Sequence, residues 1–282
     1  MSGKTNYIKK SVFFRLNIFT ILTLVILVIL TISMTKTIVR PQLESRFLNM
    51  ASQAGHTILA EFSKDLSKAK TLSKVLAKWS ETAEQSVPLY KRTLPVLINL
   101  KAERDFIAGG GIWPEPYAFD KNIARRSFFW GRNKSGILEY FDDYNDIKGA
   151  GYHNEEWYVP VKLLPKNTVY WSQAYTDPYT LQPMVTCSTP IYIKSQFSGV
   201  STIDIKLDGL QESIQQVVAK FHGYGFVLDR FNQVVFYSRE IKLPKNKILY
   251  GYNDILETSE SYKPVIKAVL SLETPTDKFT EN

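Results

Sequence analysis

The chain opens with an apolar run that stands out from the rest of the sequence. Residues 16–34 hold no charged side chain, and their only polar residues are Asn17, Thr20, Thr23, Thr31 and Ser33. A helix of this length rises roughly 28 Å, close to the hydrocarbon thickness of a bilayer. A cleaved signal peptide normally has a shorter apolar region and a small-x-small cleavage site, and a soluble core helix is rarely apolar on every face. We therefore expect an uncleaved transmembrane helix at 16–34.

Basic residues flank this segment unequally. Four precede it and two follow it closely: Lys4, Lys9, Lys10 and Arg15, then Lys36 and Arg40. The excess on the N-terminal side favours a cytoplasmic N-terminus over residues 1–15. Everything after about residue 35 is then expected to lie outside the cytoplasm.

A long amphipathic pattern comes after the apolar run. From Pro41 onward, apolar residues recur at steps of three or four, at Leu43, Phe47, Ala51, Ala54, Ile58, Phe62, Leu66, Ala69, Leu72 and Leu76. This spacing predicts one helix that continues from the membrane through the segment 35–86. Its length exceeds the needs of a compact domain. We expect it to pack along its own lobes, to pair with a second copy in a homodimer, or both.

The remainder predicts two lobes of mixed structure. A helix is expected over 87–103, followed by strands at 106–113, 127–132, 136–141, 168–174, 184–193 and 199–207. The turn residues Asn133-Lys-Ser-Gly and the segment 194–197 each join two strands. After a helix over 208–219, strands at 225–229 and 233–238 open a smaller lobe, with one more helical run at 261–270. The fold class is therefore α/β (α+β) with antiparallel sheets, and the second lobe is expected to be incomplete and the chain truncated.

Charge and residue types exclude several functions. The net charge is +8, but residues 1–40 hold six Lys/Arg and no Asp/Glu, so the remainder carries 29 − 27 = +2, and nucleic-acid binding is not expected. The single Cys187 and three well-separated histidines form neither an intramolecular disulfide nor a zinc site. No Gly-x-Ser-x-Gly, His-Glu-x-x-His or cysteine–histidine cluster is present. We expect a protein that is not an enzyme and uses no cofactor and no metal.

The most specific pattern lies between residues 152 and 207. It consists of Y-H-N-E-E-W-Y-V-P, Y-W-S-Q-A-Y-T-D-P, M-V-T-C-S-T-P-I-Y and F-S-G-V-S-T-I-D-I-K-L, in that order. With Trp113-Pro-Glu-Pro after a glycine-rich strand, these segments resemble the double Cache (tandem PAS-like) sensor family over roughly residues 40–282. That family occurs in bacterial chemoreceptors, sensor histidine kinases and diguanylate cyclases. The resemblance implies a periplasmic sensor anchored in the inner membrane, with a membrane-distal Cache lobe at 87–207 and a connecting helix and proximal lobe at 208–282.

The same resemblance implies a ligand site in the distal lobe. Trp157, Tyr158 and Asp177 match ligand-contact positions of the family. The full candidate set is Asp177, Trp157, Tyr158, Tyr152, Tyr175, Trp171, Trp113 and Arg126. Asp177 suits a ligand ammonium group, because a buried carboxylate and a cation compensate each other's desolvation. The aromatic residues are expected to form walls by stacking or cation–π contact, and Arg125 or Arg126 to pair with a ligand carboxylate.

Two departures from the family leave the ligand class open. The amino-acid-binding subset carries an Arg two positions before the Trp-Tyr pair and a Tyr seven positions before the Trp, where this chain has Glu155 and Ala150. A small amine, an amino acid and a carboxylate all remain candidates. Asp177 also fits a plain turn before Pro178, and Trp157 and Tyr158 also fit a core. The alternative function is an ectodomain that binds a partner protein and no small ligand. The segments Trp-Pro-Glu-Pro and Trp-Tyr-x-Pro resemble those of cyclase and kinase receptors, so the parent protein is expected to be a diguanylate cyclase or histidine kinase.

Overall fold

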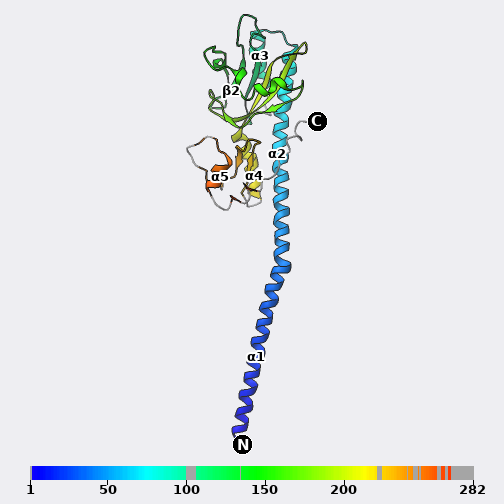
Figure 1. Cartoon of the computed structure of the whole chain (residues 1–282), viewed down its shortest axis with the longest axis vertical. Coiled ribbons are helices and arrows are strands. Elements are labelled where there is room, and N and C mark those ends of the chain that lie inside the picture. The colour runs from blue at the N-terminus through cyan, green and yellow to red at the C-terminus, as the bar shows by residue number, and fades with distance from the viewer. Residues whose placement is uncertain are drawn as a thin grey trace. The chain divides into compact units, whose positions relative to one another are not determined.

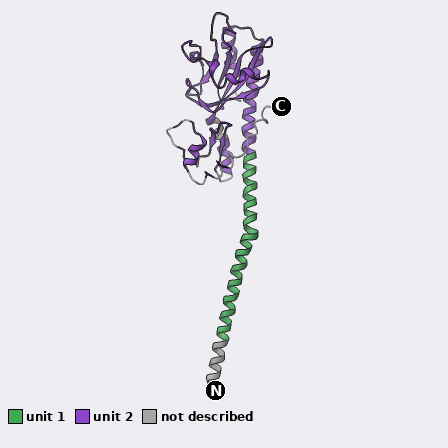
Figure 2. Cartoon of the chain, viewed as in Figure 1, with its two compact units in different colours: residues 1–56 green, residues 57–282 purple. Residues whose placement is uncertain are grey.

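The structure is a computed structural model, and it describes residues 2–99, 106–133, 135–220, 224–239, 241–243, 247, 249–258, 262–263 and 266–267. Two compact units divide the chain, residues 1–56 and residues 57–282 (Figure 2). The first unit is helical throughout its described part, and the second contains both sheets.

The first unit is built by helix α1 (Ser2–Met34), a short π-helical stretch Thr35–Val39, and the start of α2 (Arg40–Thr82). Within the described part of the chain, one helix is long and apolar enough to cross a membrane, judged by length and composition, and its most apolar window has a hydropathy of 2.6. Thr20, Thr23 and Thr31 each donate their hydroxyl to the carbonyl oxygen four residues earlier. These hydroxyls are therefore satisfied within the helix, as an apolar surrounding demands.

Only the C-terminal part of helix α2 is buried. Its buried residues are Ala69, Leu72, Ser73, Leu76, Ala77 and Ser80, spaced as the amphipathic pattern predicts. Earlier members of the same pattern stay exposed, with Leu43 at 48% and Phe47 at 65%. The sequence pattern is thus correct about the helix, and this chain alone buries only part of its apolar stripe.

A seven-stranded antiparallel sheet forms the larger lobe (Figure 1). Its order is β3 (Leu138–Phe141), β2 (Phe128–Arg132), β1 (Ile107–Pro114), β7 (Gln196–Lys206), β6 (Pro183–Ile193) and β4 (Tyr170–Trp171), while β5 (Tyr175–Thr176) also pairs with β6. Helix α3 (Val87–Ile98) covers one face together with α2. The expected antiparallel α+β lobe is confirmed; residues 100–103 of the expected 87–103 helix lie outside the described residues.

The β6–β7 hairpin shows why these two strands are long and in register. Ile193 pairs with Gln196, so only Lys194 and Ser195 form the turn. Both have positive φ, 48° and 66°. Two consecutive residues in the left-handed backbone conformation make a type I′ turn, whose twist matches that of the flanking strands.

One expected strand is shorter than predicted. The pattern predicts a strand over 168–174, but the structure has only Tyr170–Trp171 and a separate pair, Tyr175–Thr176. Between them, the backbone N–H of Ala174 donates to the carboxylate of Asp229 at 3.0 Å. The side chain of Asp229, which is distant in sequence, thus accepts a backbone N–H that would otherwise bond to a neighbouring strand.

The two faces of the sheet are chemically different. Odd positions of β6 and β7, such as Cys187 and Ile203, join the apolar core under α2 and α3. Even positions, such as Thr186 and Asp204, face the other way, because side chains alternate along a strand. On that opposite face lies a second cluster dominated by aromatic side chains: Trp113, Phe129, Tyr144, Tyr152, Trp157, Tyr158, Val161 and Val200.

Close contact between β1 and β2 requires glycine. A Cβ on Gly111 would lie 2.3 Å from the carbonyl oxygen of Phe128, whereas one on Gly55 in α2 would meet no atom within 4 Å. We expect Gly111→Ala to lower the free energy of unfolding by about 1–3 kcal/mol through overpacking, and Gly55→Ala to raise helix stability by about 1 kcal/mol. Chemical denaturation of the full chain in detergent measures both. Equal stability of Gly111→Ala and wild type would contradict the β1–β2 register.

The smaller lobe begins directly after β7. It contains α4 (Leu207–Lys220), the two-stranded sheet of β8 (Phe226–Leu228) and β9 (Val234–Tyr237), and α5 (Tyr252–Thr258). Ile214 and Val218 of α4 pack on Phe236. Most of the helical run expected at 261–270 lies outside the described residues. The second, small sheet agrees with the expected smaller lobe.

Candidate functional site

Asp177 is the centre of a tight turn between β5 and β6. Its Oδ2 accepts hydrogen bonds from the backbone N–H of Thr180 at 2.6 Å, from the Thr180 hydroxyl at 2.7 Å and from the N–H of Tyr179 at 3.2 Å. Its Oδ1 accepts the Tyr144 hydroxyl at 2.9 Å. Only 1% of Asp177 is exposed. Asp177 is therefore a turn residue and is also buried on the aromatic face. All four groups that donate hydrogen bonds to its carboxylate are neutral.

Two further carboxylates lie within electrostatic reach of Asp177. Asp204 of β7 is 3% exposed and accepts the Thr186 hydroxyl at 2.8 Å. Burial, with a contribution from the charge of Asp177, raises the pKa of Asp204 to about 7. Burial and the same charge also raise the pKa of Glu155. None of the three carboxylates takes part in a salt bridge among the described residues.

Tyr175 connects this group to the sheet. Its hydroxyl lies 2.8 Å from the hydroxyl of Thr186, which in turn donates to Asp204. Burial, together with the charges of Asp204, Asp177 and Glu155, raises the pKa of Tyr175 well above its usual value. We call Asp177, Asp204, Glu155 and Tyr175 the acidic cluster, a group with three carboxylates and no basic member.

A buried hydroxyl on the same face also lacks a partner. Ser188 is two residues from Thr186 on β6, so both side chains leave the same side of the sheet. Its Oγ is fully buried and makes no hydrogen bond in the described part of the chain. Such groups are rare in native proteins and call for an explanation.

The aromatic cluster packs beside the acidic cluster. Trp113 is the common neighbour, with ring centroids 4.7 Å from Trp157, 5.0 Å from Tyr144 and 5.5 Å from Tyr152. Its indole N–H donates to the Thr202 hydroxyl at 2.8 Å, and the Tyr152 hydroxyl donates to the carbonyl oxygen of Pro114 at 2.7 Å. These polar atoms already have protein partners, so the rings contribute apolar surface.

The sequence-predicted residues separate into two groups. The first group gathers on the aromatic face and consists of Asp177, Tyr175, Trp113, Tyr152 and Trp157. Tyr158 is buried among the same rings, although its hydroxyl is directed to Glu115 at 2.9 Å.

Trp171 lies on the other side of the sheet, and Arg126 lies before strand β2. Trp171 pairs with Cys187 and packs against the core under α2. The charge of Arg126 acts on the hydroxyl of Tyr140. Arg125 donates to the carbonyl oxygens of Asp146 and Gly149, at 2.6 and 2.9 Å. Neither of these two arginines joins the acidic cluster, and Trp171 does not join it either.

Sequence reasoning did not assign Asp204, Glu155 or Tyr144 to the site. The signal for Asp204 is a single acidic residue in Ser-Thr-Ile-Asp-Ile, inside a strand whose neighbours are buried on both faces. A carboxylate there must be hydrogen-bonded, protonated or matched by a cation.

The segment 170–176 is also tied to the smaller lobe. Arg230, in the β8–β9 turn, donates to the carbonyl oxygen of Trp171 at 2.7 Å and lies 4.6 Å from the ring centroid of Tyr170. The Tyr170 hydroxyl donates to Glu156. Together with the Asp229–Ala174 bond, these contacts link segment 170–176 to the smaller lobe on one side, while Tyr175 links it to Asp204 on the other.

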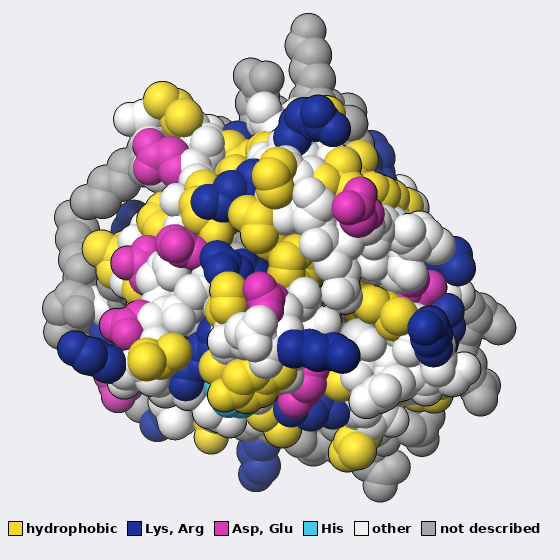
Figure 3. Space-filling view, turned by 90° about the horizontal axis from the view of Figure 1, so that it is seen from above, with side chains coloured by type: hydrophobic (Ala, Val, Ile, Leu, Met, Phe, Trp, Pro, Cys, Tyr) yellow, Lys and Arg dark blue, Asp and Glu magenta, His cyan; other side chains and the backbone are white. Residues whose placement is uncertain are grey.

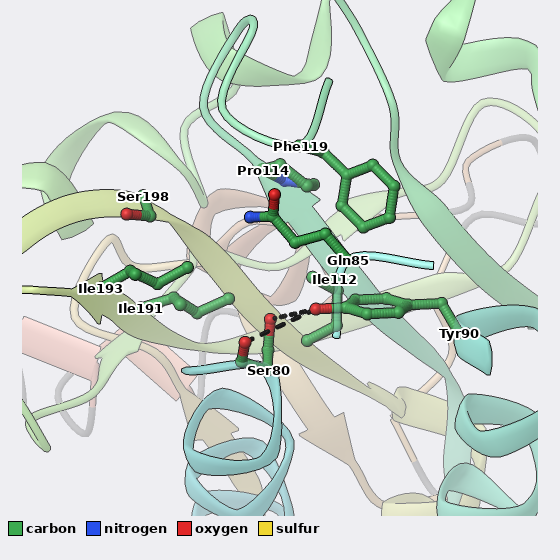
Figure 4. A pocket seen from close by; sticks show the side chains of 9 residues that line it. All are labelled: Ser80, Gln85, Tyr90, Ile112, Pro114, Phe119, Ile191, Ile193 and Ser198. Atoms are coloured by element: carbon green, nitrogen blue, oxygen red, sulfur yellow. Dashed lines mark hydrogen bonds between the residues drawn. The ribbon is translucent and has the colours of Figure 1, made fainter. Parts of the chain in front are cut away.

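The small cleft shown in Figure 4 lies elsewhere, between the end of α2 and strands β1 and β6. Its free volume is about 10 Å³, the space of one water molecule. Two of its hydroxyls, those of Ser80 and Tyr90, lie 3.0 Å apart and bond to each other. This cleft is too small for an organic ligand.

The surface charge is mixed on the face shown in Figure 3. Lys and Arg side chains alternate there with Asp, Glu and apolar ones. A nucleic acid requires a continuous basic surface, which this face does not offer.

The fold and the comparison with known families together define the class of protein. Residues 94–212 match the family model described as "Methyl-accepting chemotaxis protein-like, first PDC sensor domain". The match spans the end of α3, the seven-stranded sheet and the start of α4. The chain therefore carries a sensor domain of the dCache (MCP-like PDC) type, and the resemblance drawn from residues 152–207 is confirmed.

Solved structures with this fold include domains of a putative histidine kinase and of a chemoreceptor. The extracellular domain of a putative histidine kinase, soHK1S-Z6, is 23% identical with a TM-score of 0.55, covering 74% of this chain and 79% of its own. The sensory domain of the Campylobacter jejuni chemoreceptor Tlp3 (CcmL) is 17% identical with a TM-score of 0.52, covering 80% of each chain. The Tlp3 ligand-binding domain in complex with 4-methylisoleucine is 20% identical with a TM-score of 0.53, covering 76% and 77%. At these identities the likeness shows the fold.

The matched family and these similar structures belong to chemoreceptors and histidine kinases, so they do not support the expected diguanylate cyclase parent. No curated protein sequence matches the chain. Among the described residues, no three His, Cys, Asp or Glu side chains lie close enough to hold a metal ion. The three carboxylates of the acidic cluster are therefore not grouped around one ion position.

Proposed function

We propose that the chain is an extracytoplasmic sensor that binds a small organic amine at the acidic cluster. The observation that carries the proposal is a set of three carboxylates, two buried and one half-buried, in which the charge of Asp177 acts on both Asp204 and Glu155, with no basic side chain paired to them among the described residues. Burying charge without compensation is costly, and a ligand ammonium group supplies the missing compensation.

The same observation favours an amine over an amino acid. A bound amino acid brings a carboxylate, which needs a cation or several N–H donors beside it. Arg125 is engaged with backbone carbonyls, and the charge of Arg126 acts on the hydroxyl of Tyr140. Glu155 stands where the amino-acid-binding subset of the family carries Arg. A ligand carboxylate would therefore meet repulsion at this site.

The surroundings also suit an amine with an apolar body. Tyr144, Trp113 and Trp157 form a wall next to Asp177. Aromatic faces attract ammonium groups by cation–π contact, and their area favours the burial of alkyl or aryl carbon. The hydroxyls of Tyr175, Thr186 and Ser188, the last without a partner among the described residues, add acceptors for N–H bonds.

A route from this site to helix α2 is available in the packing. Ser73 of α2 lies 2.8 Å from the Thr189 hydroxyl, and the Ser201 hydroxyl donates to the Ser73 carbonyl at 2.8 Å. Thr189 and Ser201 belong to β6 and β7, the strands that carry Thr186 and Asp204 on their other face. A ligand that favours one arrangement of these strands therefore biases the position of α2.

We propose a transmembrane-receptor arrangement for the segments of the chain. We assign residues 1–15 to the cytoplasm, 16–34 to the membrane, 35–86 to the signalling helix, 87–207 to the membrane-distal lobe and 208–282 to the connecting helix and proximal lobe. The exposed apolar stripe at Leu43 and Phe47 supports pairing of α2 with a second copy in a homodimer. The output domain of the parent lies outside these assignments.

A ligand panel tests the amine proposal. The full chain, purified in detergent, is mixed with primary and quaternary amines, branched-chain amino acids and aliphatic carboxylates, and its melting temperature is measured. At 100 times its dissociation constant, a ligand adds about 2.7 kcal/mol of stability. We expect amines alone to raise the melting temperature. A rise with amino acids or carboxylates and none with amines would overturn the proposed class, and no rise with any compound would favour a protein partner.

A further inference from the structure

We propose a second ligand site, separate from the acidic cluster: a cleft on the flank of α2 that binds a small dianion bearing carboxylate or phosphate groups. The cleft has a volume of about 470 Å³, within the usual range for small-molecule sites. Helix α2, the connection before β4 and strand β6 line it with Lys74, Ala77, Lys78, Glu81, Lys166, Asn167, Thr189 and Pro190.

Two of the three lysines are held in place by one buried carboxylate. The Glu81 side chain is only 6% exposed and bonds Lys166 Nζ at 2.8 Å and Lys78 Nζ at 3.3 Å. It also accepts the backbone N–H of Tyr192 at 3.4 Å. Burial acts to raise the pKa of Glu81, but the bonds from Lys166, Lys78 and Tyr192 outweigh it, and the pKa lies below its usual value. Glu81 therefore remains charged and orients two ammonium groups at the cleft.

The third lysine is Lys74, one helical turn before Lys78. Within the described part of the chain, no ion pair holds Lys74. Partial burial and the charge of Lys70, one helical turn away, lower the pKa of Lys74. Like charges at this spacing on a helix disfavour each other unless an anion lies between or beside them.

The charge balance defines the ligand. Lys74, Lys78 and Lys166 contribute three positive charges and Glu81 one negative charge, which leaves two positive charges uncompensated on the cleft wall. A dianion balances them, and Lys binds carboxylate and phosphate oxygens as a point charge. Asn167, also on the wall, adds an amide group able to donate to an anion.

A ligand in this cleft would link helix α2 to the connection before β4. Lys74 and Lys78 belong to α2, whereas Lys166 belongs to the connection that leads into β4. An anion between them fastens α2 to the sheet on the side opposite to the acidic cluster, since Thr189 faces α2 and Thr186 faces away. The proposal therefore does not depend on which ligand the acidic cluster takes.

Calorimetry on the full chain in detergent tests the site with inorganic phosphate and with succinate, each balanced with sodium chloride to equal ionic strength. We expect saturable binding of at least one of them, and binding at least tenfold weaker in Lys74→Gln and in Lys166→Gln. Lys148→Gln, at an exposed lysine on a turn away from the cleft, is the matched control and should bind like wild type. The stronger of the two probes identifies the anion chemistry.

Two results would overturn the proposal. One is an absence of saturable binding by either probe beyond the effect of chloride. The other is equal affinity in wild type, Lys74→Gln and Lys166→Gln, which would move any binding to another surface. Because all three substitutions exchange exposed or half-exposed lysines, the melting temperature of each variant without ligand should stay close to that of wild type, so that a loss of binding is not a loss of fold.

Discussion

Asp177→Asn is expected to weaken amine binding at least a hundredfold while leaving the lobe folded. The substitution removes the charge that faces the ligand ammonium, and truncating one partner of a buried charge pair typically costs 2–5 kcal/mol, where about 2.7 kcal/mol is a factor of one hundred. Asn keeps an oxygen that accepts the N–H and hydroxyl of Thr180, and the Tyr144 hydroxyl can turn to accept from the new amide. Calorimetric titration of the full chain with the strongest amine of the panel measures the change.

The matched control is Asp143→Asn. Asp143 is exposed and adjacent to Tyr144, so it changes the same unit of charge in the same neighbourhood without touching the acidic cluster. We expect its affinity to stay within about twofold of wild type, since exposed charges interact weakly in water. Equal affinities for wild type and Asp177→Asn, with both variants folded, would place the amine elsewhere. A similar loss of amine affinity in both variants would indicate that long-range electrostatics, and not direct contact, controls binding.

Asp204 is expected to make both stability and amine affinity depend on pH. The pKa of this carboxyl in the folded chain is about 7, raised from 3.8 chiefly by burial. Between those two values the folded chain holds a proton that the unfolded chain has lost. The free energy of unfolding without ligand therefore falls as pH rises from 5 to 7, by up to about 1.4 kcal/mol per pH unit. A bound ammonium favours the ionised carboxylate, so amine affinity rises over the same window by up to about tenfold per unit.

Asp204→Asn isolates this contribution. The variant should lose most of the pH dependence of both quantities and should exceed wild type in stability at pH 8 when no ligand is present. Glu155, whose pKa is also raised, contributes a slope of the same sign that remains in the variant. Denaturant titration and calorimetry at pH 5, 6, 7 and 8 provide the comparison. Parallel pH profiles for wild type and variant would show that Asp204 is not the titrating group.

Much of the fold could be predicted because its signals are local. The expected strand 184–193 corresponds to Pro183–Ile193, and the expected turn at 194–197 contains the two left-handed residues Lys194 and Ser195. The early end of the expected 168–174 strand at Trp171 was missed, because the carboxylate that accepts the N–H of Ala174 belongs to Asp229, more than fifty residues later in the chain. Local periodicity carries no information about a partner so distant.

For the site, the sequence named several residues that the structure gathers on one face. Asp177 was named because it matches a ligand-contact position of the family and Tyr175 because it is an aromatic residue nearby, and both act electrostatically with Asp204. Trp171 and Arg126 were grouped with them because they are near in sequence or carry suitable chemistry. Strand alternation instead sends Trp171 toward the core under α2, since a shift of one residue moves a side chain to the other face. Arg126 lies before β2, and its charge acts on Tyr140.

The sequence by itself determined the features that depend on neighbours a few residues apart. These are the apolar helix over 16–34, the amphipathic stripe of α2, the hairpin turns and the antiparallel α+β class. The tertiary structure decided which acids act on one another: Glu155, Asp177 and Asp204 come from a loop, a turn and a central strand. The raised pKa values of Glu155 and Asp204 arise from burial and from the charge of Asp177, and so does the need for a cation. That property exists only once the β6–β7 hairpin and the turn at Asp177 have brought Asp177 within electrostatic reach of the other two carboxylates.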